Sequence, residues 1–90
     1  MTRYRKKLTE VDALQLTGGN HPEVAKFLAR HGATFLYDAI TQTFIIHTRH
    51  GKEDLAEGDW AVYNKDLDTG NKTCRYKPRA FEATYEQVTA

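Results

Sequence analysis

The stretch NHPEVAKFLAR, residues 20–30, decides the fold because it carries the clearest secondary-structure signal in the chain. Val24, Phe27, Leu28 and His31 recur at spacings of three and four residues. Side chains at these spacings lie on one side of an α-helix, so the pattern predicts a helix whose apolar stripe faces a core.

Both ends of this helix carry residues that favour a helix start or stop. Asn20 is a good N-cap, because its side-chain oxygen can accept a hydrogen bond from a free backbone N–H of the first turn. Glu23 follows three residues later, as in a capping box, and Pro22 is tolerated in the first turn. Gly32 is expected to end the helix in the left-handed conformation.

Strand signals lie on both sides of the helix. Before it, residues 8–17 place leucines at alternate positions and predict a strand with one buried face, which Gly18 and Gly19 interrupt. After it, further strands are expected at residues 34–37, 42–48, 59–63 and 72–77, and the alternation within 42–48 suits a strand covered on both faces. Turns are expected at residues 38–41, 49–52 and 66–71. Pro78 is expected to open a short turn or helical piece, and residues 84–88 to close the sheet.

Length and composition set the class of protein. A chain of 90 residues is long enough for a single domain, residues 1–90. One helix followed by mostly antiparallel strands indicates an α+β fold, with the helix packed on a small, mostly antiparallel sheet or partial barrel. No apolar run approaches the roughly 20 residues that span a bilayer, and no secretory signal is expected. The single cysteine, Cys74, fits a reducing compartment, so we expect a cytoplasmic protein.

Charge is distributed unevenly along the chain. The net charge is only +1, but cations gather near both ends and leave the middle net acidic. The basic clusters are Arg3, Arg5, Lys6 and Lys7 near the start, and Lys72, Arg75, Lys77 and Arg79 near the end. The acidic residues of the middle include Glu53, Asp54, Glu57, Asp59, Asp66 and Asp68.

Several motifs at the two ends resemble a family of small phage and prophage proteins. The motifs are Tyr4-Arg5-Lys6-Lys7, Gln15-Leu16-Thr17-Gly18, Gly58-Asp59-Trp60, and Lys77-Pro78-Arg79-Ala80-Phe81-Glu82-Ala83-Thr84-Tyr85-Glu86. The chain departs from the family pattern at Leu8, Leu16 and Glu57, where the family usually has proline, tryptophan and proline. The resemblance implies a phage or prophage origin and a cytosolic role in the host cell. It implies no catalytic residue, because no activity is carried over from the family.

Candidate catalytic and metal-binding residues are few. His47 and His50 are three apart, so on a regular strand they point to opposite faces and do not share a metal. Cys74 has basic neighbours, Arg75 and Lys77, that can lower the pKa of a thiol, but no local motif marks it as a nucleophile. The acidic residues from Glu53 to Asp59 lack the spacing of a calcium loop, so they predict a solvated loop, with Asp59 bonded to the backbone of its turn. We therefore predict no catalytic residue, metal or cofactor, and no enzyme.

A basic and aromatic patch is the candidate ligand-binding site. If the first and last strands are neighbours, the two basic clusters converge beside aromatic side chains. The candidate residues are Arg5, Lys7, Trp60, Arg75, Tyr76, Lys77 and Arg79. The alternative is a set of core aromatic residues surrounded by the stems of lysines and arginines.

Three functions follow as hypotheses. The first is a non-enzymatic phage or prophage accessory protein that binds a host or host-defence component through a surface patch, with a homodimer expected because a small sheet has exposed edges. The second is a sequestering protein for a nucleotide-type, small phosphorylated ligand. The third is a minor virion component. Nucleic acid is not the favoured partner, because a net charge of +1 is small for such a protein, and no membrane is expected.

Overall fold

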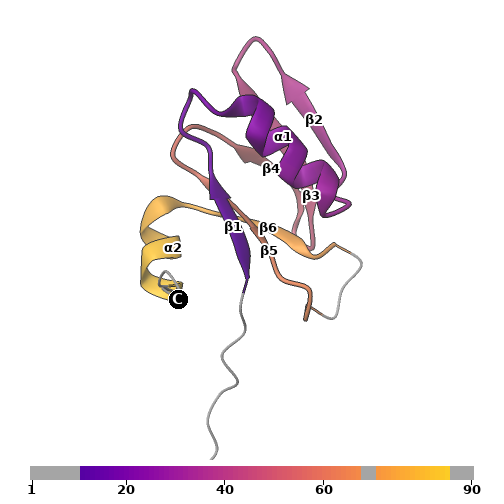
Figure 1. The fold of residues 1–90 in the computed structure, drawn as a ribbon, viewed down its shortest axis with the longest axis vertical. Coiled ribbons are helices and arrows are strands. Elements are labelled where there is room, and N and C mark those ends of the chain that lie inside the picture. Colours follow the sequence, from indigo (N-terminus) through magenta and orange to yellow (C-terminus); the bar gives the residue numbers. More distant parts are fainter. Residues whose placement is uncertain (1–10, 68–70, 86–90) are drawn as a thin grey trace, which may run out of the picture.

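Two three-stranded antiparallel sheets and one main helix build the fold (Figure 1). The computed structural model describes residues 11–67 and 71–85. The elements in chain order are β1 (Asp12–Gln15), α1 (His21–Arg30), β2 (Phe35–Asp38), β3 (Thr43–Thr48), β4 (Gly51–Leu55), β5 (Trp60–Tyr63), β6 (Thr73–Tyr76) and α2 (Pro78–Thr84). One sheet has the order β1-β5-β6 and the other β2-β3-β4. The predicted α+β class is confirmed, and the sheets do not close into a barrel.

A single core joins α1 to both sheets. Val24, Phe27 and Leu28 of α1 are buried, as the helical spacing predicts. They pack in one cluster with buried side chains from the two sheets, which are Leu16, Phe44, Ile46, Leu55 and Ala61. Buried residues of β3 alternate with outward residues that are only partly buried. The strand expected at residues 42–48 is confirmed, but among the described residues its outward side lacks the cover that was expected on both faces.

The start of α1 is built differently from the predicted cap. In the described part of the chain, no side chain caps the N-terminus of α1. The Asn20 side chain instead accepts a hydrogen bond from the Thr17 N–H (2.8 Å) and donates one to the Gln15 carbonyl (2.7 Å). The predicted side-chain cap is therefore wrong, because Asn20 bonds to the preceding loop and ties it to the end of β1. At the other end, Gly32 has φ +70°, so the predicted left-handed stop is confirmed.

One strand was not predicted. Residues 51–55 were expected to be a turn and a solvated acidic loop, but they form β4, which pairs with β3. Lys52, Glu53 and Asp54 hide the strand pattern, because only Leu55 is fully buried. Charged residues are common on edge strands, where water reaches one side.

Two further points of the sequence analysis concern the β1-β5-β6 sheet and the segment after it. Strand β6 pairs with β5 as predicted for residues 72–77, but β5 also pairs with β1 and separates the two. The first and last strands are therefore not neighbours. Thr84 ends α2 and Tyr85 has extended backbone outside any strand, so the described part of segment 84–88 does not close the sheet.

Candidate functional site

The aromatic residues of the predicted patch pack on one another. Trp60 and Tyr76 stand opposite each other in the register of β5 and β6, and by strand alternation they point to the side opposite the core residue Ala61. α2 packs on this side through Phe81. Phe81 of α2 stacks on Trp60 with ring centroids 3.9 Å apart and an interplanar angle of 6°. Tyr85 contacts both Phe81 and Tyr76. One face of the Trp60 ring is therefore covered by Phe81 and is not free to stack on a base.

The cations of the predicted patch are held by carboxylates. Arg75 Nη2 lies 2.9 Å from Glu53 Oε2, and Lys77 Nζ lies 3.1 Å from Asp59 Oδ2. Asp59 is only 3 % exposed, and its carboxylate also accepts a hydrogen bond from the Ala56 N–H. The predicted backbone bond of Asp59 in its turn is thereby confirmed.

The remaining residues of the patch divide into two groups. Arg79 is exposed near the start of α2. Arg5 and Lys7 lie outside the described residues. Convergence of the two basic clusters was expected only if the first and last strands were neighbours, and among the described strands β5 separates β1 from β6.

The ion pair between Glu53 and Arg75 is structural in character. Partial burial acts to raise the pKa of the Glu53 carboxyl, but hydrogen bonds from Thr48 and Arg75, together with the Arg75 charge, outweigh it. The pKa therefore lies below its ordinary value. Because Thr48 also bonds to Gly51, these contacts fasten β6 to the turn between β3 and β4.

An open depression of about 660 Å³ lies beside this ion pair. Among its described lining residues, three cations face three carboxylates, which are Lys52, Arg75, Lys77, Asp38, Glu53 and Asp54. A site for a phosphate group needs an excess of positive charge or of N–H donors. The balanced charges of this depression do not favour a nucleotide-type ligand.

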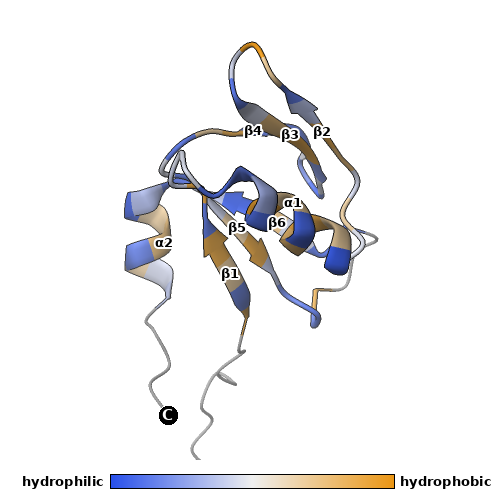
Figure 2. Cartoon of the chain, turned by 45° about the horizontal axis from the view of Figure 1, so that its top comes forward, coloured by the Kyte–Doolittle hydropathy of each residue, from blue (hydrophilic) through white to orange (hydrophobic). Residues whose placement is uncertain are grey.

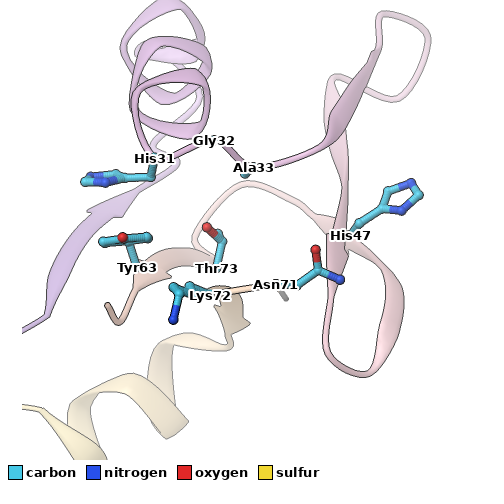
Figure 3. A pocket seen from close by; sticks show the side chains of 8 residues that line it. All are labelled: His31, Gly32, Ala33, His47, Tyr63, Asn71, Lys72 and Thr73. Carbon is cyan, nitrogen blue, oxygen red and sulfur yellow. The ribbon is translucent and has the colours of Figure 1, made fainter. Parts of the chain in front are cut away.

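A smaller cavity of about 80 Å³ lies between the end of α1 and β3 (Figure 3). His31 and His47 line it from different elements, and the ring of His47 points away from it. The Tyr63 ring stacks on the His31 ring with centroids 4.1 Å apart. Lys72 Nζ donates to the carbonyls of Lys65 and Leu67. The volume suits a few water molecules and is far below that of a pocket for a cofactor or nucleotide.

The residues singled out for catalysis or metal binding do not form such a site. Within residues 11–67 and 71–85, no three metal-ligating side chains come together. His50 bonds to the neighbouring Arg49, while His47 lines the small cavity. Burial raises the pKa of the half-buried Cys74 thiol, so the expected lowering by its basic neighbours is wrong. Neither helix in the described part of the chain has the length and apolar character to span a membrane.

The hairpin formed by β2 and β3 presents the surface that sequence reasoning missed. It projects beyond the rest of the molecule, and its tip is the most hydrophobic point of the cartoon (Figure 2). Ile40 at this tip is 95 % exposed, Leu36 of β2 is 66 % exposed and Tyr37 is 46 % exposed. The available signal was an isoleucine within a predicted turn, where polar residues and glycine usually occur.

The tip that carries Ile40 is held in shape by its own hydrogen bonds. The Asp38 carboxylate accepts from the N–H groups of Ile40 (3.0 Å) and Thr41 (3.4 Å). The Gln42 carbonyl lies 3.1 Å from His21 Nε2 of α1, and Gln42 adopts φ +57°. The isoleucine is therefore exposed on an ordered turn that is tied to the body of the protein.

The outward face of the β2-β3-β4 sheet is also open. α1 packs on the inner face through Phe44 and Ile46, and α2 packs on the other sheet. By strand alternation the outward face carries Leu36, Asp38, Thr43, Ile45, His47, Lys52 and Asp54. No helix among the described residues covers this face.

Comparison with protein-family models, curated proteins and solved structures finds no match to the chain.

Proposed function

We propose that this protein is a non-enzymatic phage or prophage accessory protein that binds a host or host-defence protein through the tip of the β2–β3 hairpin. The observation that carries the proposal is Ile40, which is 95 % exposed on a turn fixed by the Asp38 carboxylate. A large apolar side chain held in water by an ordered backbone costs little entropy to dock.

The surroundings of Ile40 define the chemistry of the partner. The tip projects from the rest of the molecule (Figure 2), so it fits a protein with a small apolar pocket rather than a flat surface. Tyr37 and Leu36 stand beside the tip and add apolar and aromatic area, and aromatic residues are enriched at binding hot spots. Asp38 supplies the only charge among residues 35–42, so the rim of the pocket is expected to be neutral or basic.

The experiment compares wild type with Ile40→Asp in capture from host lysate, followed by binding measurements on the purified partner. A buried aspartate in an apolar pocket is strongly unfavourable, so the variant is expected to bind at least about tenfold more weakly. Ile40→Val keeps the apolar contact and should bind within a few-fold of wild type. Equal binding by Ile40→Asp, or the absence of any stoichiometric host protein, would contradict the proposal.

A further inference from the structure

The four sheet edges of the described fold are not equally protected. β4 carries Lys52, Glu53 and Asp54, and β6 lies against β3 and β4. The β6 edge carries Arg75, and β1 lies against α1. Charged side chains and covering elements are the usual protection of an edge strand against pairing with another chain.

Within residues 11–67 and 71–85, strand β2 has neither kind of protection. Its sequence is Phe35-Leu36-Tyr37-Asp38, and its single charge, Asp38, is engaged in the hairpin turn. It pairs with β3 on one side only. Among the described strands it is thus the edge best suited to accept another strand.

The register of the β2–β3 pair fixes which backbone groups point outward. The His47 N–H donates to the Thr34 carbonyl at 3.0 Å, and these residues stand opposite each other in the register. Hydrogen-bonded and non-hydrogen-bonded pairs alternate in an antiparallel ladder, so Leu36 also directs its N–H and C=O to β3. The N–H and C=O groups of Phe35 and Tyr37 therefore point to the free edge.

The N–H and C=O groups of Phe35 and Tyr37 at the free edge can pair with the same groups of a second copy of the protein. We propose that two copies of the protein pair antiparallel through β2, around a two-fold axis at Leu36, to form a continuous six-stranded sheet. In this register Phe35 of each copy stands opposite Tyr37 of the other, and both pairs exchange N–H and C=O groups. Four intermolecular hydrogen bonds result, and they use every outward backbone group of those two residues.

The side chains agree with this register. The two Leu36 residues form a non-hydrogen-bonded pair, the arrangement in which side chains approach most closely, and each is 66 % exposed in the single chain. On the inner face, Phe35 and Tyr37 form two aromatic cross-strand pairs. Asp38 stands opposite Thr34 of the second copy, so no like charges face each other across the axis.

Sedimentation velocity of the full chain at increasing concentration tests the dimer. The average mass is expected to rise from 10.3 kDa towards twice that value as concentration approaches about 1 mM. Leu36→Lys places two ammonium groups at the axis and is expected to weaken dimerisation at least about tenfold. Wild type that stays at 10.3 kDa, or Leu36→Lys that associates like wild type, overturns the proposal.

Disulfide trapping tests the register independently. In a Cys74→Ser background, Leu36→Cys is expected to form a disulfide-linked dimer under mild oxidation, because a non-hydrogen-bonded pair has Cα atoms about 4.5 Å apart. Thr34→Cys is the matched control, because Thr34 is exposed but its two copies lie about 13 Å apart along the paired strands. Equal trapping at both positions excludes this register.

The dimer and the proposed partner site share Leu36 and Tyr37, but they can be separated at Ile40. Ile40 lies beyond the paired residues, so Ile40→Asp is expected to dimerise like wild type while it loses the host partner. If Ile40→Asp keeps its partner but the dimer forms as described, only the proposed function fails. If partner binding needs Ile40 but no dimer forms, only the dimer proposal fails.

Discussion

The two sheets differ in how completely the described chain covers them. The β1-β5-β6 sheet packs its inner face on the core, and its other face lies beside the stacked rings of Trp60 and Phe81. Its cations Arg75 and Lys77 are neutralised by buried or half-buried carboxylates. The β2-β3-β4 sheet instead leaves Leu36, Ile40 and its outward face open. Exposed apolar area on ordered backbone suits a binding surface, so our proposal places partner binding on the β2-β3-β4 sheet.

The largest expected effect on stability comes from a substitution on the inner face of the β2-β3-β4 sheet. Phe44 is 2 % exposed and belongs to the core cluster. Phe44→Ala is expected to lower the free energy of unfolding by ~3–5 kcal/mol, because it leaves a cavity in the core. Urea unfolding measures this change. Ile40→Ala, on the same hairpin, should change the free energy of unfolding by less than ~0.5 kcal/mol. Similar losses of stability for both variants would contradict the placement of Phe44 in the core and of Ile40 at the surface.

The next effect concerns the buried carboxylate of the covered sheet. Asp59→Ala removes the acceptor of the Ala56 N–H and the partner of Lys77, and it leaves Arg75 with one carboxylate fewer. The free energy of unfolding is expected to fall by ~2–3 kcal/mol. Thermal unfolding measures the loss, with Glu57→Ala as the exposed acidic control. A loss no greater than that of the control would show that Asp59 is not structural.

The ion pair between Glu53 and Arg75 predicts a pH dependence. The pKa of Glu53 in the folded state lies below its ordinary value of 4.5, so its carboxylate stabilises the fold fully above about pH 4.5. That contribution is lost as the pH falls through the folded-state pKa, because protonation then removes the charge.

Urea unfolding between pH 3 and 7 tests this dependence. Glu53→Gln should be less stable than wild type at neutral pH by ~1–2 kcal/mol, and the difference should shrink in acid. An undiminished difference at low pH would show that the carboxylate charge is not responsible.

The stacked rings predict a smaller, local effect. Phe81→Ala removes the ring that covers Trp60, so α2 should loosen and Trp60 should become more exposed to water. We expect a loss of ~1 kcal/mol beyond the effect on apolar burial and a red shift of tryptophan fluorescence. Because Trp60 is the only tryptophan, the signal reports on this face alone. An unshifted spectrum would mean that α2 does not cover the sheet.

The smallest effect concerns Cys74. Burial raises the pKa of its thiol above the ordinary value of 9.0, so little thiolate exists at neutral pH. Alkylation by iodoacetamide at pH 7 should be slower than that of a free cysteine, and the rate should keep rising beyond pH 9. An alkylation rate that reaches a plateau near neutral pH would contradict the raised pKa of the Cys74 thiol and would support a nucleophilic role.

Sequence patterns predicted those parts of the fold in which one side of an element is apolar. Val24, Phe27 and Leu28 identified α1, and the alternation around Phe44 and Ile46 identified β3. β4 was not predicted, because its charged residues lie on an edge strand that water reaches. The hydrogen bonds of the Asn20 side chain were not predicted either. Its side-chain oxygen can accept equally well from the first turn of the helix or from the preceding loop, and the sequence does not distinguish the two.

The candidate site was harder to predict than the fold. Basic and aromatic residues near the ends suggested one patch, but the pairing of Arg75 with Glu53 joins residues 22 positions apart, which no local pattern encodes. Exposure of Ile40 is likewise a property of the folded hairpin. An isoleucine is usually buried, so its type alone predicts the opposite.

The central claim is that partner binding belongs to the hairpin of the open sheet and not to the basic and aromatic patch of the covered one. Quantitative capture from host lysate with wild type, Ile40→Asp and Arg79→Ala tests it most directly, with circular dichroism as the check on folding. We predict that one host protein is captured stoichiometrically by wild type and Arg79→Ala, and at least about tenfold less by Ile40→Asp. Loss with Arg79→Ala and retention with Ile40→Asp would contradict the account.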